Sequence, residues 1–350
     1  MRGRVVVLGE LSGREAAALI VDGRLEDLLI EPPEDAGPGL GAILRAVADR
    51  PMKGQGAMFV ALPGGATGYL RETGGIAPGA AVIVQVTGHP EPGKAIPVTR
   101  RVLFKGRHAI VTPDAPGRNI SRRIRDDEAR ARLAALAEAG MAGSVFGLIL
   151  RSAAADAASD DVAGEIASLR ALAEEIMRDA TGGPELLLDA PSPHEEAWRD
   201  WADPAPDEVL SDPGAIETQG VPAMVAALRS AQVRLAGGGH MAIEPTRALI
   251  AVDVNTGGDT SPAAGLKANI AAVRELARQL RLRGLGGQVT VDFAPMPKKD
   301  RAALEQQMRT AFKGEAAETV LAGWTPLGNY ELQRKRDRLP LSETLKGLSL

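Results

Sequence analysis

ALIAVDVN at residues 248–255 and QVTVDF at residues 288–293 decide the fold of this 350-residue chain. The first segment is a compact apolar run, and the second alternates apolar and polar residues; both patterns are typical of β-strands. Between them, apolar residues recur at the helical period, at Leu266, Ile270, Val273, Ala277 and Leu280. A glycine-rich stop follows at Gly284. We therefore expect a βαβ unit with two parallel strands and a right-handed crossover.

Each of these strands carries one aspartate near its carboxyl end, Asp253 in the first and Asp292 in the second. Open α/β sheets bind ligands at that edge, and neighbouring strands lie about 4.8 Å apart, so the two carboxylates should lie close together. Asn255 should point to the same side as Asp253. Two carboxylates and an amide oxygen are hard ligands suited to Mg²⁺ or Mn²⁺. The alternative is that these residues only cap a helix or shape a turn.

Composition limits the class of protein. With 350 residues, 45% of them apolar, the chain has room for two or three domains with their own cores. It has no cysteine, which excludes disulfides and thiolate zinc sites and favours a cytoplasmic location. We expect neither a signal peptide nor a membrane span, because no apolar stretch approaches about 20 residues. The net charge of −4 requires any nucleic-acid binding to use local basic surfaces.

Short β-like runs with glycine turns fill residues 40–113 and suggest a small barrel such as an OB-fold. Before them, Asp22-Gly23 between two apolar runs predicts a β-hairpin. Within the barrel region, Phe59 and Tyr69 are candidates for stacking on RNA bases, with Lys94 among the nearby phosphate contacts. The alternative is that Phe59 belongs to the core.

Further along the chain the signals are weaker. An apolar strand over 146–150 ends in Arg151-Ser152, which is a plausible phosphate pocket, although any solvated arginine would look the same. Residues 191–222 are rich in Pro, Asp and Glu and indicate surface loops, with Trp198 and Trp201 expected to pack inside. The basic run over 329–338 is either a solvated helix or an RNA contact. The four histidines are scattered, so we expect neither zinc nor histidine-based catalysis.

Several motifs then occur in order, over residues 252–257, 277–287 and 291–293, with Asn269 between the first two. Together they resemble the catalytic core of the ribonuclease E/G family. The likeness is strongest over residues 233–296 and runs more weakly from the N-terminus to about Ser342. Residues 120–124 match the family's Ile-Ser-Arg-Arg-Ile loop, and 328–336 resemble its closing Gly-x-x-Glu-x-x-Arg-x-Arg segment.

The resemblance implies an endoribonuclease that cuts single-stranded RNA near A/U-rich segments and prefers a 5′-monophosphate end. It implies that Asp253 and Asp292 bind one Mg²⁺, that Asn255 supports them, and that hydrolysis leaves a 5′-phosphate and a 3′-hydroxyl. The family's S1-domain contacts to RNA fall at Phe59, Tyr69 and Lys94. Its 5′-phosphate sensor falls at Gly106, Ile110, Arg151 and Ser152.

The resemblance also implies an α/β fold of several subdomains, α+β in its overall arrangement. An RNase H-like subdomain with an inserted S1/OB barrel and a 5′-sensor region would precede a DNase I-like βαβ catalytic subdomain. The expected boundaries are 1–33 and 190–230 for the two RNase H-like parts, 38–113 for the barrel, 114–189 for the sensor region and 231–340 for the catalytic part.

The chain also departs from the family pattern. It lacks the Cys-x-x-Cys zinc link, so the zinc-linked tetramer is not expected and the oligomeric state stays open. Residues 188–233 look shortened, and no scaffold tail is expected. Members of the family usually have a second acid shortly after the residue that matches Asp292, whereas this chain has Ala294-Pro295 there. One alternative is therefore an RNA-binding family member with weakened catalysis. A phosphotransferase is the other, although the chain has no Gly-x-x-x-x-Gly-Lys-Ser/Thr loop.

Overall fold

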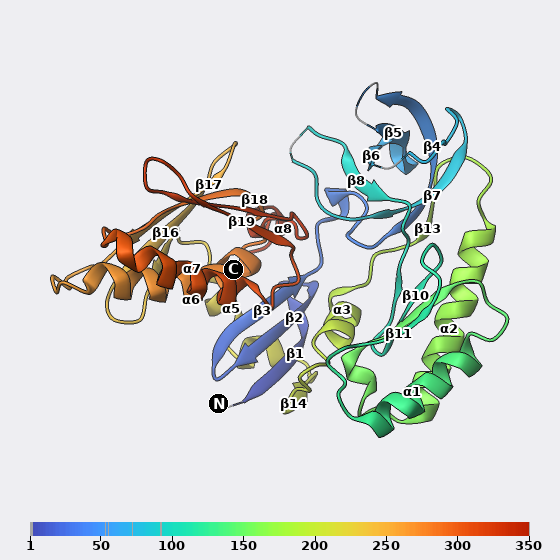
Figure 1. Ribbon diagram of the computed structural model, residues 1–350, viewed down its shortest axis with the longest axis horizontal. Coiled ribbons are helices and arrows are strands. Elements are labelled where there is room, and N and C mark those ends of the chain that lie inside the picture. The colour runs from blue at the N-terminus through green and yellow to red at the C-terminus, as the bar shows by residue number, and fades with distance from the viewer. Residues whose placement is uncertain (1–2, 53, 55, 72, 92, 350) are drawn as a thin grey trace.

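The computed structural model describes residues 3–52, 54, 56–71, 73–91 and 93–349. Within these residues the strands form four sheets, and the chain has a mixed α/β fold. Figure 1 shows the C-terminal sheet and its helices on one side, the barrel and the helices α1 and α2 on the other, and the N-terminal strands between them. Among the described helices, none combines the length and the apolar character needed to cross a lipid bilayer.

The N-terminal sheet joins distant parts of the chain. Its strand order is β14 (Glu208–Leu210), β1 (Arg4–Leu11), β2 (Arg14–Val21) and β3 (Arg24–Ile30). The predicted hairpin is confirmed: Asp22 and Gly23, with φ of 49° and 78°, form the turn between β2 and β3, and positive φ at both positions suits a type I′ turn. The helices around this sheet are α3 (Pro193–Asp200), α4 (Ala215–Thr218) and α5 (Val221–Ala227).

The predicted barrel is confirmed as a closed, five-stranded one in the described residues. Its order is β4 (Ile43–Met52), β5 (Ala57–Ala61), β6 (Thr67–Arg71), β8 (Ile96–Thr99) and β7 (Ala81–Val86), and pairing of β7 with β4 closes it. β13 (Glu185–Leu188) adds to the outside of β4. Leu44, Met58 and Leu70 fill the interior. Buried and more exposed side chains alternate along β6, whereas Ile43–Ala46 of β4 and Val82–Val86 of β7 are buried without a break.

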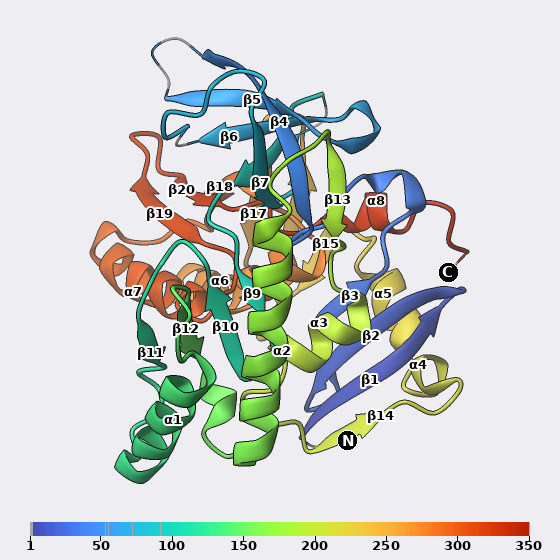
Figure 2. The ribbon, with the colours of Figure 1, turned by 90° about the vertical axis from the view of Figure 1, so that its right-hand side faces the viewer.

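A third sheet follows the barrel in the chain. Its order is β11 (Arg118–Ile120), β12 (Gly147–Leu150), β10 (Ala109–Thr112) and β9 (Phe104–Lys105). The helices α1 (Asp127–Gly140) and α2 (Ser159–Arg178) pack on it around Phe104, Leu133 and Ile166. Figure 2 shows α2 running from the barrel to α1, with the N-terminal sheet beside it.

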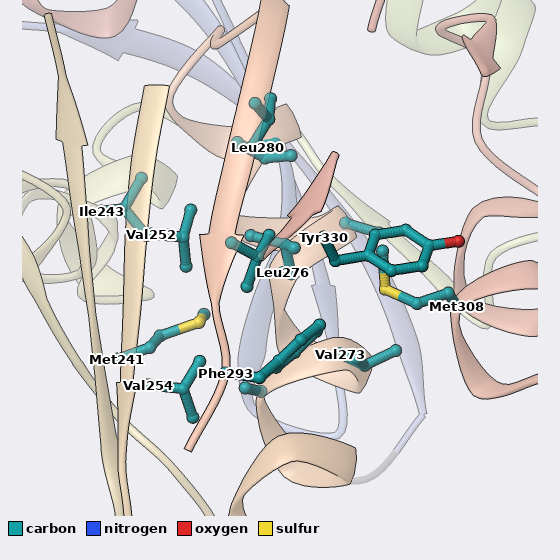
Figure 3. Close-up of a cluster of buried hydrophobic side chains, with 14 of the residues drawn as sticks. Met241, Ile243, Val252, Val254, Val273, Leu276, Leu280, Phe293, Met308 and Tyr330 are labelled. Carbon is teal, nitrogen blue, oxygen red and sulfur yellow. The ribbon is translucent and has the colours of Figure 1, made fainter. Parts of the chain in front are cut away.

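The C-terminal sheet contains the predicted βαβ unit, which is confirmed. The strand order is β15 (Gln232–Arg234), β16 (His240–Pro245), β17 (Ile250–Asn255), β18 (Gly287–Asp292), β20 (Tyr330–Arg334) and β19 (Thr319–Trp324). β17 and β18 are parallel and joined through α6 (Ala264–Leu282). α6 and α7 (Arg301–Phe312) cover one face, and Figure 3 shows Val252 and Val254 of the sheet in one core with Leu276 and Met308 of the helices.

The segment after β20 contacts both the N-terminal sheet and the barrel. Arg338 donates from Nη2 to Asp27 Oδ2 at 3.1 Å, and Arg336 O accepts from His89 N of the barrel at 2.9 Å. The helix alternative for residues 329–338 is therefore wrong, because this segment is β20 and an extended stretch whose arginines bind neighbouring elements. The short elements are α8 (Leu341–Thr344) and the 3₁₀ turns Glu34–Ala36, Pro63–Gly65, Ser152–Ala154 and Lys298–Asp300.

Candidate active site

The two aspartates of the βαβ unit lie side by side on the uncovered face of the C-terminal sheet. Asp253 and Asp292 are register partners in the parallel strands β17 and β18. Each follows a buried valine, Val252 or Val291, which points to the helix-covered face. Because side chains alternate along a strand, both carboxylates point the other way, and both are exposed. The register places two negative charges about one strand spacing, ~4.8 Å, apart.

Asn255 supports one of these carboxylates. Its Nδ2 donates to Asp253 Oδ2 at 2.7 Å, which fixes that side chain on the open face of the sheet. The alternative of helix capping is wrong for these residues, because α6 begins at Ala264, its N-cap residue is Ala263 and no side chain caps it. The two carboxylates therefore have no structural role in starting the helix.

The loop after Asp292 is held from inside the core. Asn269 of α6 is fully buried, its Oδ1 accepts from Ala294 N at 2.9 Å, and its Nδ2 donates to Ala294 O at 2.9 Å. Gly265 allows the same helix to approach, because a Cβ there would lie 2.1 Å from Pro295 O. The sequence motif contained Asn269, but it gave no partner for the residue. Both contacts fix the end of β18 and hence the position of Asp292.

The donor set fits a hard divalent cation. Asp253, Asp292 and Asn255 offer carboxylate and amide oxygens on one exposed surface. No group of three or more His, Cys, Asp or Glu residues suited to a metal occurs in the part of the chain that the structure describes. A site with two protein carboxylates suits Mg²⁺, which commonly completes its octahedron with water and substrate phosphate oxygens. The residues present therefore fit a Mg²⁺ site that substrate would complete.

The site is a surface rather than a closed pocket. A cavity of about 140 Å³ lies elsewhere, where β3, α3 and the end of α6 meet, among Leu28, Leu282 and Leu339. Neither Asp253 nor Asp292 lines it. An open face with two carboxylates can receive a polymer that passes along it, whereas an enclosed pocket would select a small molecule.

The aromatic pair of the barrel forms an exposed platform. Phe59 and Tyr69 are register partners in β5 and β6, and their ring centroids lie 6.1 Å apart. Phe59 is 37% exposed, so the alternative that it belongs to the core is wrong. Arg71 Cζ lies 5.8 Å from the centre of the Tyr69 ring, and Lys94 is exposed while its Nζ lies 2.6 Å from Glu91 Oε2. Two rings with a guanidinium beside them make this surface suited to single-stranded nucleic acid.

The residues expected at the 5′-phosphate sensor come together only in part. Arg151 Nη1 donates to Gly106 O at 2.7 Å, and Ser152 follows at the start of a 3₁₀ turn. Ile110 lies on β10, paired with Lys105 of β9 and Ile149 of β12. The pairing brings Ile110 beside the strand that leads to Gly106.

Arg151 is bound rather than simply solvated. Its Nη2 donates to Asp200 Oδ1 at 2.8 Å, and Arg199 Nη2 donates to Asp200 Oδ2 at 2.7 Å. Burial alone would raise the pKa of Asp200, but the hydrogen bonds and charges of Arg199 and Arg151 outweigh it and hold that pKa below its ordinary value. The sequence did not indicate Asp200, which lies outside every expected site. Its carboxylate is the anionic group that Arg151 binds in this structure.

Comparison with known proteins gives the family. The profile of the ribonuclease E/G family matches residues 104–219 and 213–337. Ribonuclease E of Synechocystis sp. is 30% identical over 318 residues, which cover 78% of this chain and 47% of the relative. Ribonuclease E of Nostoc sp. is 31% identical over 304 residues (75% and 44%), and ribonuclease G of Haemophilus influenzae is 27% identical over 305 residues (76% and 62%). The chain belongs to the ribonuclease E/G family, and it spans about half the length of the ribonuclease E relatives.

Proposed function

We propose that the protein is a Mg²⁺-dependent endoribonuclease that hydrolyses single-stranded RNA and leaves a 5′-phosphate and a 3′-hydroxyl. Mn²⁺ would serve the same oxygen ligands. The observation that carries the proposal is the register pairing of Asp253 with Asp292 on the open face of the sheet, in a chain of the ribonuclease E/G family.

In this proposal Asp253 and Asp292 are the metal ligands and Asn255 orients Asp253. When bound, Mg²⁺ would polarise the scissile phosphate and lower the pKa of a water molecule. The bond from Asn255 is made to Oδ2 of Asp253, and in this proposal Oδ1 meets the metal. Asn269 acts as a positioning residue, because it holds the loop that follows Asp292.

RNA binding uses surfaces away from the carboxylates. Phe59 and Tyr69 stack on bases, and Lys94 meets the backbone. Gly106, Ile110, Arg151 and Ser152 form the 5′-phosphate site. Asp200 is bonded to Arg151, and in this proposal a 5′-phosphate displaces this carboxylate. We also propose the RNase H-like assignment for the N-terminal sheet and the DNase I-like assignment for residues 231–340, with the barrel as an S1 domain.

The test is internal cleavage of an end-labelled, A/U-rich single-stranded RNA by the purified protein, with Mg²⁺ or with EDTA. Cleavage should require Mg²⁺ and should fall at least about 100-fold in Asp253→Asn, while RNA binding changes little. Asp259→Asn is the matched control, because this carboxylate follows the same strand but accepts from Ser261 N at 2.8 Å. Its cleavage rate should stay near that of the wild type.

Two other results would contradict the proposal. Binding of RNA with no cleavage at any Mg²⁺ or Mn²⁺ concentration would favour an RNA-binding family member with weakened catalysis. Equal cleavage by the wild type and Asp253→Asn would remove the carboxylate pair from the reaction.

A further inference from the structure

A second aromatic surface lies on α3, outside the barrel. Trp198 is 57% exposed, so the expectation that it packs inside is wrong, whereas Trp201 is buried as expected and its Nε1 donates to Asp27 Oδ2. Arg107 Cζ lies 3.9 Å from the centre of the Trp198 ring, and Arg107 Nη1 donates to Trp198 O at 2.7 Å. The Arg107 guanidinium therefore covers part of the Trp198 ring and is also hydrogen-bonded to the backbone of Trp198.

Arg107, which covers the Trp198 ring, lies in a turn that is itself fixed. Arg107 lies in the turn between β9 and β10, and Glu165 of α2 fixes this turn, because its Oε1 accepts from His108 N and Ala109 N, both at 2.8 Å. Gly106 is required here, since a Cβ at this position would lie 2.2 Å from Glu165 Oε1. An aromatic surface that is ordered before binding loses little conformational entropy when a ligand stacks on it.

Positive charge gathers next to the ring. Arg151 Nη1 contacts Gly106 O at 2.7 Å and Arg199 O at 3.2 Å, and these two residues are the chain neighbours of Arg107 and Trp198. The cations of this surface are Lys105, Arg107, Arg151 and Arg199. The carboxylates are Asp200, held by Arg151 and Arg199, Glu165, held by the hairpin, and Glu196, which interacts with Arg199 and Asp200.

The balance of charge at this surface is positive. Desolvation and the neighbouring charges of Arg199 and Arg151 lower the pKa of Lys105, although Asp200 opposes the effect. A ring flanked by an excess of cations is suited to a ligand that carries both a flat π-system and a negative charge. A nucleotide has both features, whereas an apolar protein segment brings no negative charge to the cations.

We propose that Trp198, backed by Arg107, stacks on a base of single-stranded RNA close to its 5′ end, so that a backbone phosphate of that RNA faces Arg151 and Arg199. The site is separate from the Phe59–Tyr69 platform, which lies in the barrel. It rests on the proposed function, because it assumes that the chain binds RNA. Every base has a π-face, so the site adds affinity near the 5′ end without sequence preference.

The experiment measures binding of a short 5′-monophosphorylated A/U-rich RNA, labelled at its 3′ end, by fluorescence anisotropy in EDTA. Trp198→Ala should weaken binding by about 5- to 100-fold, the usual loss for one stacked base. Trp198→Phe keeps an aromatic ring and should bind within about threefold of the wild type. Val145→Ala, which truncates another exposed apolar side chain, is the control and should bind normally.

A second set of RNAs locates the stacked base. An abasic nucleotide at one of the 5′-terminal positions should weaken binding to the wild type and should remove the difference between wild type and Trp198→Ala. Quenching of tryptophan fluorescence by RNA is a second measurement of stacking, and it compares the wild type with Trp198→Phe instead of Trp198→Ala. RNA should quench the wild type more than Trp198→Phe.

The outcomes separate this site from the proposed function. Normal RNA binding by the wild type together with unchanged binding by Trp198→Ala would overturn the Trp198 site alone, and would leave a protein partner as the occupant of this surface. Equal losses in Trp198→Ala and Trp198→Phe would also overturn stacking. A wild type that binds no RNA would contradict the proposed function and this site together.

Discussion

At the scale of single residues, Asn269 connects the buried core to the exposed carboxylates. Its amide bonds both backbone groups of Ala294, which lies two residues after Asp292. A buried backbone N–H or C=O without a partner costs about 1–3 kcal/mol, so these bonds matter more than exposed ones. The same amide lies 3.4 Å from Met296 Sδ. One side chain in α6 thus determines the course of the loop beside the proposed metal site.

Asn269→Leu should lower the free energy of unfolding by about 1–3 kcal/mol for each Ala294 group left without a partner. It should also reduce the cleavage rate more than RNA affinity, because Asp292 loses its fixed position. Urea unfolding and single-turnover cleavage measure the two effects. A variant with wild-type stability would show that Ala294 finds other partners.

The residues of the carboxylate site could be predicted from the sequence, because strand alternation and a parallel crossover determine where Asp253, Asn255 and Asp292 point. The contact between Asp200 and Arg151 could not, because two segments far apart in the chain meet there. The exposure of Trp198 also depends on tertiary packing, and a tryptophan alone carries no signal for it.

At the scale of elements, α6 sets the geometry of the C-terminal sheet. Eleven of its residues are buried, and Gly265 in its first turn touches the loop after β18. A methyl group at this position would lie 2.1 Å from Pro295 O, which is backbone and cannot rotate away. The close approach of helix and loop thus depends on the absence of a side chain.

Gly265→Ala should therefore destabilise the protein by about 1–3 kcal/mol, because overpacking exceeds the usual gain from replacing a helical glycine. Gly164→Ala in α2 is the control: nothing lies within 4 Å of its added Cβ, and stability should rise by up to about 1 kcal/mol. Urea midpoints of the two variants should move in opposite directions. Shifts of the same sign would contradict the close contact.

The elements with local signals were predictable, and those defined by distant partners were not. The hairpin at Asp22-Gly23 and the βαβ unit follow from turn residues and periodicity. The parallel pairing of β14 with β1 joins residues about 200 positions apart, and no local sequence pattern predicts it. The expectation of surface loops over residues 191–222 is wrong, because they contain α3, β14 and α4. Of these, α3 has a local signal, the capping box from Ser192 to Glu195.

At the scale of the whole molecule, a buried charge cluster joins the N-terminal and C-terminal sheets. Asp27 of β3 accepts from Arg338 and from Trp201, and Arg281 of α6 lies 3.7 Å from it while also bonding Glu315. Burial alone would raise the pKa of Asp27, but Arg338 and Arg281 outweigh it and keep that pKa below its ordinary value. The cluster therefore depends on an ionised carboxylate.

Arg338→Met should destabilise the protein at pH 7 by about 3–5 kcal/mol, because it leaves a buried carboxylate without its main partner. The pKa of Asp27 is lower in the folded state than in the unfolded state, where it is near 4. The ionised carboxylate therefore stabilises the fold fully above about pH 4, and this stabilisation is lost as the pH falls through the folded-state pKa. The difference between wild type and variant should therefore shrink below about pH 4.

Urea unfolding across this pH range measures the effect. Lys346→Met is the control, because its ion pair with Glu343 is exposed and should add little to stability at any pH. If the difference in free energy of unfolding between the wild type and Arg338→Met stays constant from pH 7 into the acid range, the Asp27–Arg338 pair does not cause the pH dependence of stability.

The most direct test of the central claim is the single-turnover cleavage rate of end-labelled single-stranded RNA by Asp253→Asn, Asp292→Asn and the double variant at saturating Mg²⁺. If the two register partners form one metal site, each single change should remove at least about 100-fold of the rate. The double variant should then be no slower than the slower single variant, because residues that act as a unit are not additive. A double variant that loses the product of the two effects, or a single variant at full rate, would contradict a shared site.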